Sequence, residues 1–176
     1  MLRDILIYPD KRLKNISDSI EKFDDDLHTL LDDMYETMIK KNGVGLAAIQ
    51  IDVPLRVLII NIPIDTDSDD PAIQQPRENT LEVINPVITH MDGKTKYQEG
   101  CLSVPGYFEE VERAREIRVE YLDRHGNEHV LEDDGFLAIA LQHEIDHLDG
   151  KIFVEKLSIL KRKKFEKEWK KRARQG

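Results

Sequence analysis

Two histidines and a glutamate within residues 141–150 have the spacing of a metal site. His143, Glu144 and His147 form the pattern H-E-x-x-H. On a helix, residues four apart lie about 40° apart around the axis, so both imidazoles face the same side. Two neutral imidazoles one turn apart can bind a divalent metal, and the glutamate between them can carry a proton. The motif therefore predicts a metal centre with a neighbouring acid–base group.

The residues before this motif predict that its helix is buried. Residues 136–141 are apolar on nearly every face of a helix, a pattern typical of the core. Unpaired buried charge is costly, so two histidines and two acids in such a helix need partners or a function. The alternative is a solvated helix end that matches the motif by chance, because short motifs recur.

The only cysteine of the chain, Cys101, lies in the segment EGCLSVP at residues 99–105. The glycine before it and the proline after it indicate a tight, non-helical setting. Most lone cysteines are buried and unreactive. A catalytic metal nevertheless needs a third protein ligand, and beyond Gly150 there is no histidine, with Glu155 as the nearest acid. Cys101 is therefore the strongest candidate for that ligand.

The glycine-rich segment GVGLAAIQ, residues 43–50, is open to two interpretations. It formally matches G-x-G-x-x-A of dinucleotide-binding folds, but that pattern must follow a strand and open a helix, whereas this segment follows a predicted helix. It is then either a plain connection between a helix and a strand or a place where another group approaches the backbone closely.

The elements that must hold these segments follow from hydrophobic periodicity. A helix is predicted from Asp24 or Asp25, which can cap its start, to Asn42-Gly43, which supplies its end. Its apolar positions recur at spacings of three and four: Leu27, Leu30, Leu31, Met34 and Met38.

Several strands are also predicted. Residues 5–8 form a strand or an extended entry, and residues 55–61 form a strand buried on both faces. Residues 81–88 form a strand at an edge or with a bulge, because Asn85-Pro86 interrupts it. Residues 116–131 form a β-hairpin, and residues 62–80, with four Asp and three Pro, form a surface loop.

The end of the chain is basic. After a short strand at residues 152–154, Ser158 can cap a last helix that reaches about residue 173. Its apolar stripe is narrow: Leu157, Leu160, Phe165 and Trp169. Residues 156–176 carry a net charge of +8, so the remaining 155 residues carry −17, the difference between the total of −9 and +8. A basic tail on an acidic body indicates an anionic partner.

Length and composition limit the class of protein. A chain of 176 residues with 40% hydrophobic and 35% charged residues is expected to form one globular domain. A single cysteine excludes an internal disulfide framework and fits a reducing compartment. Residues 1–13 contain no long apolar run, which argues against a signal peptide or a membrane span. We expect a cytoplasmic protein that has no membrane partner.

These elements predict an α+β fold. Antiparallel or mixed β-sheets should pack around a buried central helix that carries H-E-x-x-H, and a basic helix should follow at the C-terminus. Residues 1–156 should form a catalytic domain, and residues 157–176 a helical extension of that same domain.

Taken together, GVGLAAIQ, EGCLSVP and QHEIDHLDG closely resemble the three motifs of the bacterial peptide deformylases, in the same order. The resemblance covers most of the chain and includes the helical C-terminal extension of one type within the family. It implies a metal-dependent hydrolase that removes the formyl group from N-formylmethionine of nascent polypeptides and releases formate.

The resemblance also implies a metal and its ligands. The ligands of the family fall on Cys101, His143 and His147. The metal is expected to be iron(II), Fe²⁺, although the ligand chemistry alone would favour zinc. Zn²⁺, Ni²⁺ or Co²⁺ can take its place.

By the same resemblance, Glu144 accepts a proton from the attacking water and returns it to the departing amine, while the Gln50 side-chain amide and the Leu102 backbone N–H stabilise the oxyanion. Glu99 pairs with Arg113 to fix the cysteine loop. The substrate would be bound by Val44, Gly45, Phe136, Ile139, Ala140 and the ring of His143. Some members carry an arginine that helps to bind the peptide backbone, where Phe108 stands in this chain.

The expected partners are an N-formylmethionyl nascent peptide and, through the basic helix, ribosomal RNA near the exit tunnel. Two other classes stay open. A zinc peptidase would use the same H-E-x-x-H on internal amides, but no third ligand follows at the usual spacing. A non-catalytic metal-binding or ribosome-associated protein would not need Glu144 and Gln50.

Overall fold

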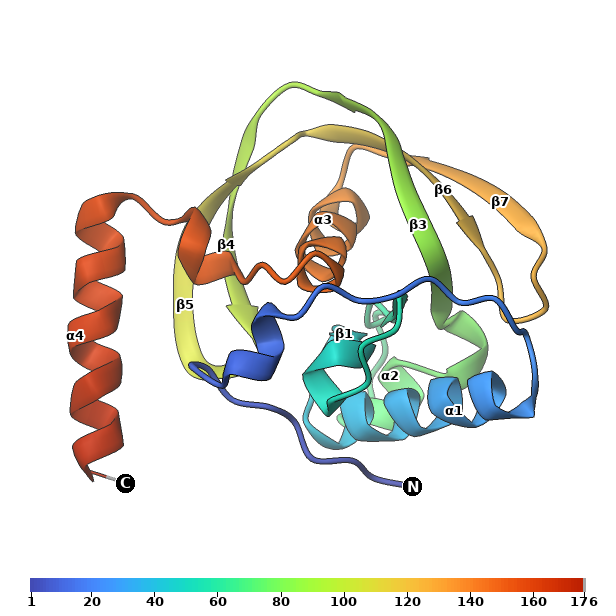
Figure 1. The fold of residues 1–176 in the computed structure, drawn as a ribbon, viewed down its shortest axis with the longest axis horizontal. Helices are drawn as coiled ribbons and strands as arrows, with labels where there is room; N and C mark the ends of the chain where they lie inside the picture. The colour runs from blue at the N-terminus through green and yellow to red at the C-terminus, as the bar shows by residue number, and fades with distance from the viewer. Residues whose placement is uncertain (176) are drawn as a thin grey trace.

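The computed structural model describes residues 1–175; Gly176, the last residue of the predicted extension, lies outside them. The fold is α+β, and every pair of neighbouring strands is antiparallel. One sheet has five strands in the order β1-β2-β3-β6-β7, and the other pairs β4 with β5 (Figure 1). The strands are β1 Gly45–Ala47, β2 Val57–Ile60, β3 Leu81–Asp92, β4 Thr95–Cys101, β5 Val104–Arg113, β6 Glu116–Leu122 and β7 Glu128–Asp133.

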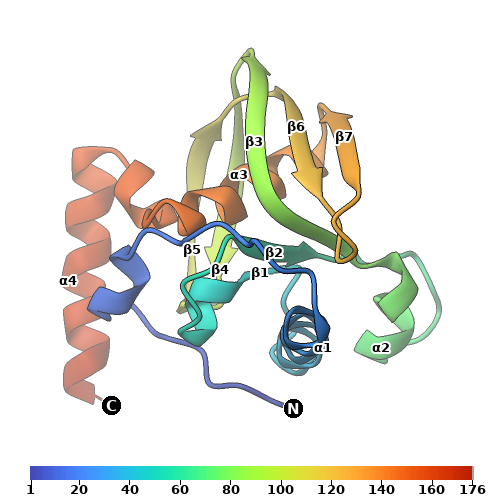
Figure 2. The same cartoon turned by 45° about the vertical axis from the view of Figure 1, so that its right-hand side comes forward.

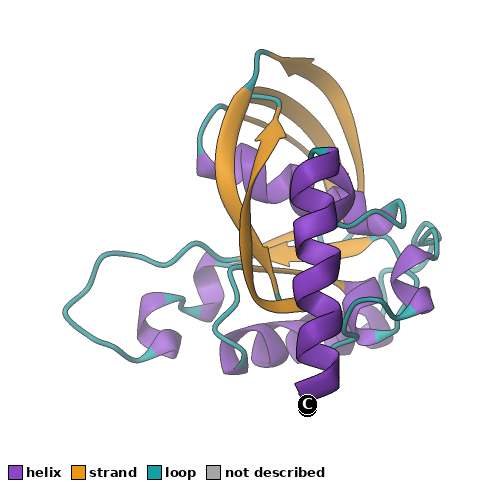
Figure 3. Cartoon of the chain, turned by 90° about the vertical axis from the view of Figure 1, so that its left-hand side faces the viewer, coloured by secondary structure: helices purple, strands orange, loops and turns teal. Residues whose placement is uncertain are grey.

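The helices lie around and between these sheets. Helix α3 runs between the curved strands, and α1 lies beside β1 and β2 (Figures 1 and 2). Helix α4 stands alongside the two-stranded sheet, on the opposite side of the molecule from α2 (Figure 2). In Figure 3, which views the molecule from that side, α4 stands in front of the rest of the chain. The α-helices are α1 Asp25–Lys40, α2 Pro71–Gln74, α3 Phe136–Leu148 and α4 Ile159–Gln175, and the 3-10 helices are Lys11–Lys14, Ala48–Ile51, Arg77–Asn79 and Phe153–Lys156.

Helix α1 confirms the helix predicted from Asp24. The Asp24 carboxylate accepts a hydrogen bond from the Leu27 N–H at 3.1 Å, which satisfies a free donor at the helix start. The predicted apolar positions are buried in one cluster with β1 and β2. All four residues of β2 are also buried, as expected for a strand covered on both faces.

Strand β3 contains the bulge predicted at Asn85. The pairing with β6 shifts register between Ile84 and Val87, and Asn85 has φ +51°. Its side-chain amide bonds to both the N–H and the C=O of Ile20, at 2.8 and 2.9 Å. The strand itself lies between β2 and β6, so the alternative of an edge strand is wrong.

The N-terminal segment is extended but joins neither sheet. The Leu6 N–H donates to the Gln50 carbonyl at 2.7 Å, and the Tyr8 N–H donates to the Ser103 carbonyl at 2.8 Å. Residues 5–8 are therefore an extended entry that ties segment 43–50 to segment 99–105.

The strand predicted at residues 152–154 is wrong. Phe153–Lys156 is a 3-10 helix, and Ile152, Phe153 and Val154 are buried with Tyr107 and Phe165. The short apolar run fills the core without pairing to a strand, an ambiguity that periodicity cannot resolve in so few residues.

Helix α4 packs on the body through a smaller stripe than predicted. Phe165 is fully buried and Trp169 packs beside it, but Leu160 is 82% exposed and does not belong to the stripe. The Ser158 hydroxyl accepts a bond from the Lys161 N–H at 3.3 Å, in keeping with the predicted cap. Within residues 1–175, no helix is long and apolar enough to cross a membrane.

Candidate metal centre and active-site cleft

The three predicted metal ligands converge. Cys101 ends β4, and His143 and His147 lie one turn apart on α3. One potential ligand atom from each lies within 4.8 Å of the other two, and this is the only such group found within residues 1–175. The Cys101 Sγ lies 3.4 Å from His147 Nε2. Residues more than forty positions apart thus meet because α3 packs against the end of β4.

The donor set fits a catalytic transition metal. A thiolate and two imidazoles suit zinc, iron or nickel, and three protein ligands leave a fourth position for water or substrate. His143 Nδ1 lies 2.8 Å from Glu99 Oε1 and donates to this carboxylate, which leaves Nε2 as the nitrogen that would bind a metal. This carboxylate–histidine pairing is a common support of metal-binding histidines.

A buried arginine organises the carboxylate behind His143. Arg113 donates two bonds to Glu99, both at 2.8 Å, and a third to Asp146 at 2.6 Å. Burial alone would raise the pKa of Glu99, but the bonds from Arg113 and His143 outweigh it and hold that pKa below its usual value. Glu99 therefore stays charged and accepts a strong hydrogen bond from the His143 ring.

Glu144 is buried beside the two histidines and is not one of the converging ligands. A side chain on Gly45 would meet the Glu144 carboxyl at 3.1 Å, so β1 approaches this group as closely as a glycine allows. Glu144 Oε1 lies 3.6 Å from His143 Nε2, while the buried Oε2 has no hydrogen-bond partner. Burial raises the pKa of Glu144 to about 7. A carboxyl group with that pKa can both accept and return a proton near neutral pH.

Gln50 and Leu102 are both neighbours of Cys101, the first through space and the second along the chain. The Ala47 N–H donates to Gln50 Oε1 at 2.9 Å, which fixes the side-chain amide and turns its N–H donors the other way. Gln50 Nε2 then reaches Ser103 Oγ at 3.0 Å and Cys101 Sγ at 3.4 Å. The glycine-rich segment is thus more than a connection, since it brings an amide donor to the cysteine.

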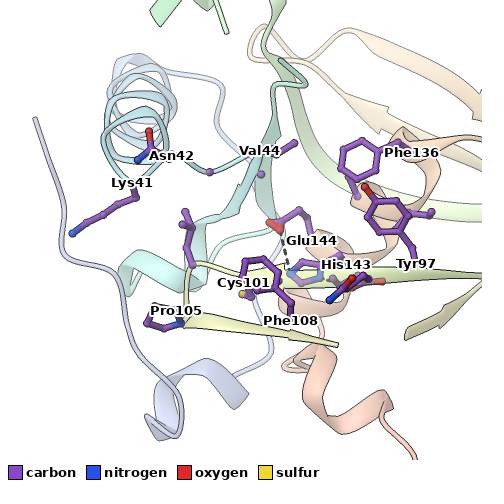
Figure 4. A pocket seen from close by; sticks show the side chains of 18 of the residues that line it. Lys41, Asn42, Val44, Tyr97, Cys101, Pro105, Phe108, Phe136, His143 and Glu144 are labelled. Carbon is purple, nitrogen blue, oxygen red and sulfur yellow. Dashed lines mark hydrogen bonds and ion pairs between the residues drawn. The ribbon is translucent and has the colours of Figure 1, made fainter. Parts of the chain in front are cut away.

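A cleft of about 460 Å³ opens onto these groups. Its floor contains Cys101, His143 and Glu144, and Figure 4 shows Val44 and Phe136 bordering the same space. The six predicted substrate-binding residues all line it: Val44, Gly45, Phe136, Ile139, Ala140 and His143. Phe108, at the position of the family's arginine, lines the opposite wall and is 61% exposed.

The sequence did not identify three supporting residues. Asp146 completes the Arg113 network from within the H-E-x-x-H turn. Ser103 receives the Gln50 amide. Gln75 comes from the predicted surface loop at residues 62–80, yet it is buried and its amide donates to the Gly43 and Asn61 carbonyls at 2.9 and 2.7 Å. Of these three, only Asp146 could have been found from the sequence, because it is an acid one turn from His143 on a helix predicted to be buried.

Comparison with known proteins identifies the family. A family model described as polypeptide deformylase matches residues 2–163. A peptide deformylase of Nautilia profundicola is 58% identical over 172 residues, which cover 98% of this chain and 95% of that protein. The chain belongs to the polypeptide deformylase family.

Solved structures agree with this assignment. A crystal structure of a peptide deformylase from Legionella pneumophila matches with a TM-score of 0.86 at 41% identity, over 99% of this chain and 96% of that one. The structure of the Ehrlichia chaffeensis enzyme in complex with actinonin matches with a TM-score of 0.84 at 42% identity, over 97% of both chains. The resemblance inferred from the three sequence motifs is confirmed.

The family establishes the reaction. Its members are metal-dependent hydrolases that remove the N-formyl group from N-formylmethionine of nascent polypeptides and release formate. The chain is therefore a hydrolase that acts on formylmethionyl peptides. This activity displaces both alternatives, the zinc peptidase and the non-catalytic protein.

The Arg113 network predicts that replacing Arg113 destabilises the protein much more than replacing an exposed arginine. Arg113→Met should lower the free energy of unfolding by about 3–5 kcal/mol, because it leaves Glu99 charged and buried without its main partner. Arg118→Met is the matched control: Arg118 pairs with the exposed Glu120 and Glu132, and its loss should change stability by less than about 1 kcal/mol. Urea unfolding in the presence of a chelator measures both, and equal losses would contradict the network's importance.

Proposed function

We propose that Cys101, His143 and His147 hold an iron(II) ion, and that Glu144, Gln50 and the Leu102 N–H perform the chemistry beside it. A divalent metal in such a set acts as a Lewis acid and lowers the pKa of a bound water molecule. The observation that carries the proposal is the convergence of three ligand atoms next to a buried carboxyl that is not among them.

Glu144 is proposed as the proton carrier of the reaction. Water adds to the formyl carbon, and the carbon–nitrogen bond breaks to give formate and a free amine. Glu144 takes a proton from the attacking water and delivers it to the leaving nitrogen, so a single group serves both half-reactions. Two observations support this role: Glu144 lines the cleft, and its Oε2 makes no hydrogen bond within the protein and so has capacity to accept a proton.

Gln50 and the Leu102 N–H are proposed to stabilise the oxyanion. Donors that are already fixed in place need no reorganisation when negative charge develops on the formyl oxygen. The bond from Ala47 supports this for Gln50, because it directs the amide N–H groups toward Cys101. Leu102 supports it by its place directly after the cysteine.

The peptide is proposed to bind along β1. The Asn61 N–H donates to the Val44 carbonyl at 2.8 Å. In an antiparallel pair, successive residues point their backbone groups alternately toward the partner strand and away from it. The N–H and C=O of Gly45, the next residue, therefore face away from β2. An extended peptide can use these groups as a further strand. The methionine side chain would enter the apolar end of the cleft, between Val44 and Phe136, Ile139 and Ala140.

The arrangement of the chain supports a wider proposal. We infer that the sheets are organised around α3, the buried helix that carries H-E-x-x-H, and that residues 157–176 extend the catalytic unit of residues 1–156. The burial of Phe165 against Tyr8 and Tyr107 favours one unit. The substrate class favours a cytoplasmic location, where nascent peptides emerge.

The exposed face of α4 is proposed to bind ribosomal RNA. Some of the charges of this helix are engaged internally: Lys161 pairs with Glu109, and Arg162 pairs with Glu166. Others are exposed and recur at helical spacing on one side: Lys163, Lys164, Lys167, Lys170, Lys171 and Arg174. Such a stripe suits a line of phosphates.

Glu144→Gln tests the proton carrier. The variant should keep its metal, because Glu144 is not a proposed ligand, while kcat falls roughly 10²–10⁴-fold through the loss of acid–base help. Formate release from formyl-Met-Ala-Ser and metal analysis of the same preparation measure the two effects. Near-normal turnover would remove Glu144 from the mechanism.

Anaerobic purification tests the metal and its cysteine ligand. The protein should contain stoichiometric iron and lose activity in air, because iron(II) beside an accessible thiolate is easily oxidised, whereas a nickel form should persist. Cys101→Ser should retain much less metal, since a hydroxyl is a poor substitute for a thiolate. Full metal content in that variant would exclude Cys101 as a ligand.

Charge reversal tests the ribosome proposal. Changing four exposed lysines of α4 to glutamate should weaken co-sedimentation with ribosomes at low salt and flatten its salt dependence, while peptide deformylation persists. The four are Lys163, Lys167, Lys170 and Lys171. A matched control reverses four exposed lysines elsewhere, namely Lys11, Lys22, Lys96 and Lys151. Equal binding by the two variants would leave the α4 charges as a merely solvated face.

A further inference from the structure

Helix α4 touches the rim of the substrate cleft. Arg172 Nη1 donates to the Pro105 carbonyl at 3.1 Å, and Nη2 donates to the Gly106 carbonyl at 3.2 Å. Pro105 and Gly106 both line the cleft that contains Cys101 and His143. The C-terminal helix is therefore joined by hydrogen bonds to the wall of the cleft, far along the chain from its catalytic residues.

Arg172 is itself held in place. Its guanidinium lies over the ring of Trp169, 5.6 Å from the centroid, and also donates to Glu168 at 3.2 Å. Trp169 in turn donates its indole N–H to the Tyr8 carbonyl at 2.9 Å. One turn earlier, the buried Phe165 packs against Tyr107 of β5. The guanidinium thus has a fixed support, which a free surface arginine lacks.

The rim segment has α4 on one side and the cleft on the other. Along β5, Tyr107 is buried with Phe165, whereas Phe108 is exposed at the cleft. The Phe108 ring lies so close to Gly100 that a Cβ there would be 2.4 Å from it. Figure 4 shows Phe108 and Pro105 along the wall that faces Lys41 and Val44.

The rim contains a glycine in the left-handed region at the point where Arg172 binds it. Gly106 has φ +73°, a conformation that glycine leaves and re-enters at little cost. A Cβ at this position would come within 3.3 Å of Arg172 Nη1, so the backbone and the guanidinium are in close contact. Without the guanidinium, the Pro105 and Gly106 carbonyls would bond to water instead. The wall that carries Phe108 would then lose its two hydrogen bonds to α4.

We propose that Arg172 is a positioning residue for peptide binding, through which α4 fixes the wall formed by Pro105, Gly106 and Phe108. The inference rests on the proposed function, in which the methionine side chain occupies the Phe136 end of the cleft. The residues after methionine are then placed toward the Pro105 end of the same cleft, at about 3.3 Å per extended residue. Formylmethionine alone does not reach this wall.

Comparing a long with a short substrate therefore distinguishes a positioning role of Arg172 from a general effect on the stability of the protein. Wild-type protein should process formyl-Met-Ala-Ser with a higher kcat/KM than formyl-methionine amide. In Arg172→Ala, the ratio of these two values should fall roughly three- to tenfold, mainly through KM of the longer peptide, because uniform binding is lost and chemistry is not. Arg172→Lys should restore part of the ratio, since an ammonium can hold one carbonyl at a time.

Arg115→Ala is the matched control. Arg115 is exposed and does not line the cleft, so the ratio should stay at the wild-type value. Thermal unfolding of each variant measures any change in folding. An unchanged ratio in Arg172→Ala, or an equal loss on both substrates, would overturn the inference while the proposed function stands. A wild-type protein inactive on both peptides would contradict the proposed function and this inference together.

Discussion

The structure of the site depends on one buried ion pair, between Arg113 of β5 and Glu99 of β4. It is costly to desolvate and is stabilising only because every strong hydrogen-bonding group in it has a partner. Arg113 reaches Asp146 on α3, and Glu99 reaches His143 on the same helix. The pair thus joins the two-stranded sheet to the helix and orients His143, a predicted metal ligand, so the contacts that hold the fold together also position this side chain.

Much of this site could be predicted from local patterns. The H-E-x-x-H spacing fixes two imidazoles on one helical face wherever that helix lies, and the apolar residues 136–141 indicate its burial. Helix α1 and strand β2 follow from periodicity and capping for the same reason. Each of these conclusions needs only residues close together in the sequence.

The remainder depends on contacts between distant residues. Nothing near Gln75 indicates that a loop with four aspartates turns its amide back onto Gly43, or that Leu160 faces water while Phe165 is buried. Residues 152–154 look like a strand because three apolar residues fit either a strand or a buried turn. The contact of Arg172 with Gly106 joins positions 66 residues apart and leaves no local pattern in the sequence.

The extended entry at residues 5–8 has a consequence for local unfolding. It bonds the backbone of Gln50 through Leu6 and that of Ser103 through Tyr8, although these two segments belong to different sheets. Detachment of residues 5–8 would release Gln50, the proposed oxyanion donor, and the cysteine loop together, as one cooperative unit. Amide hydrogen exchange at Leu6 and Tyr8 would then report on whether the segments that carry Gln50 and Cys101 stay in place.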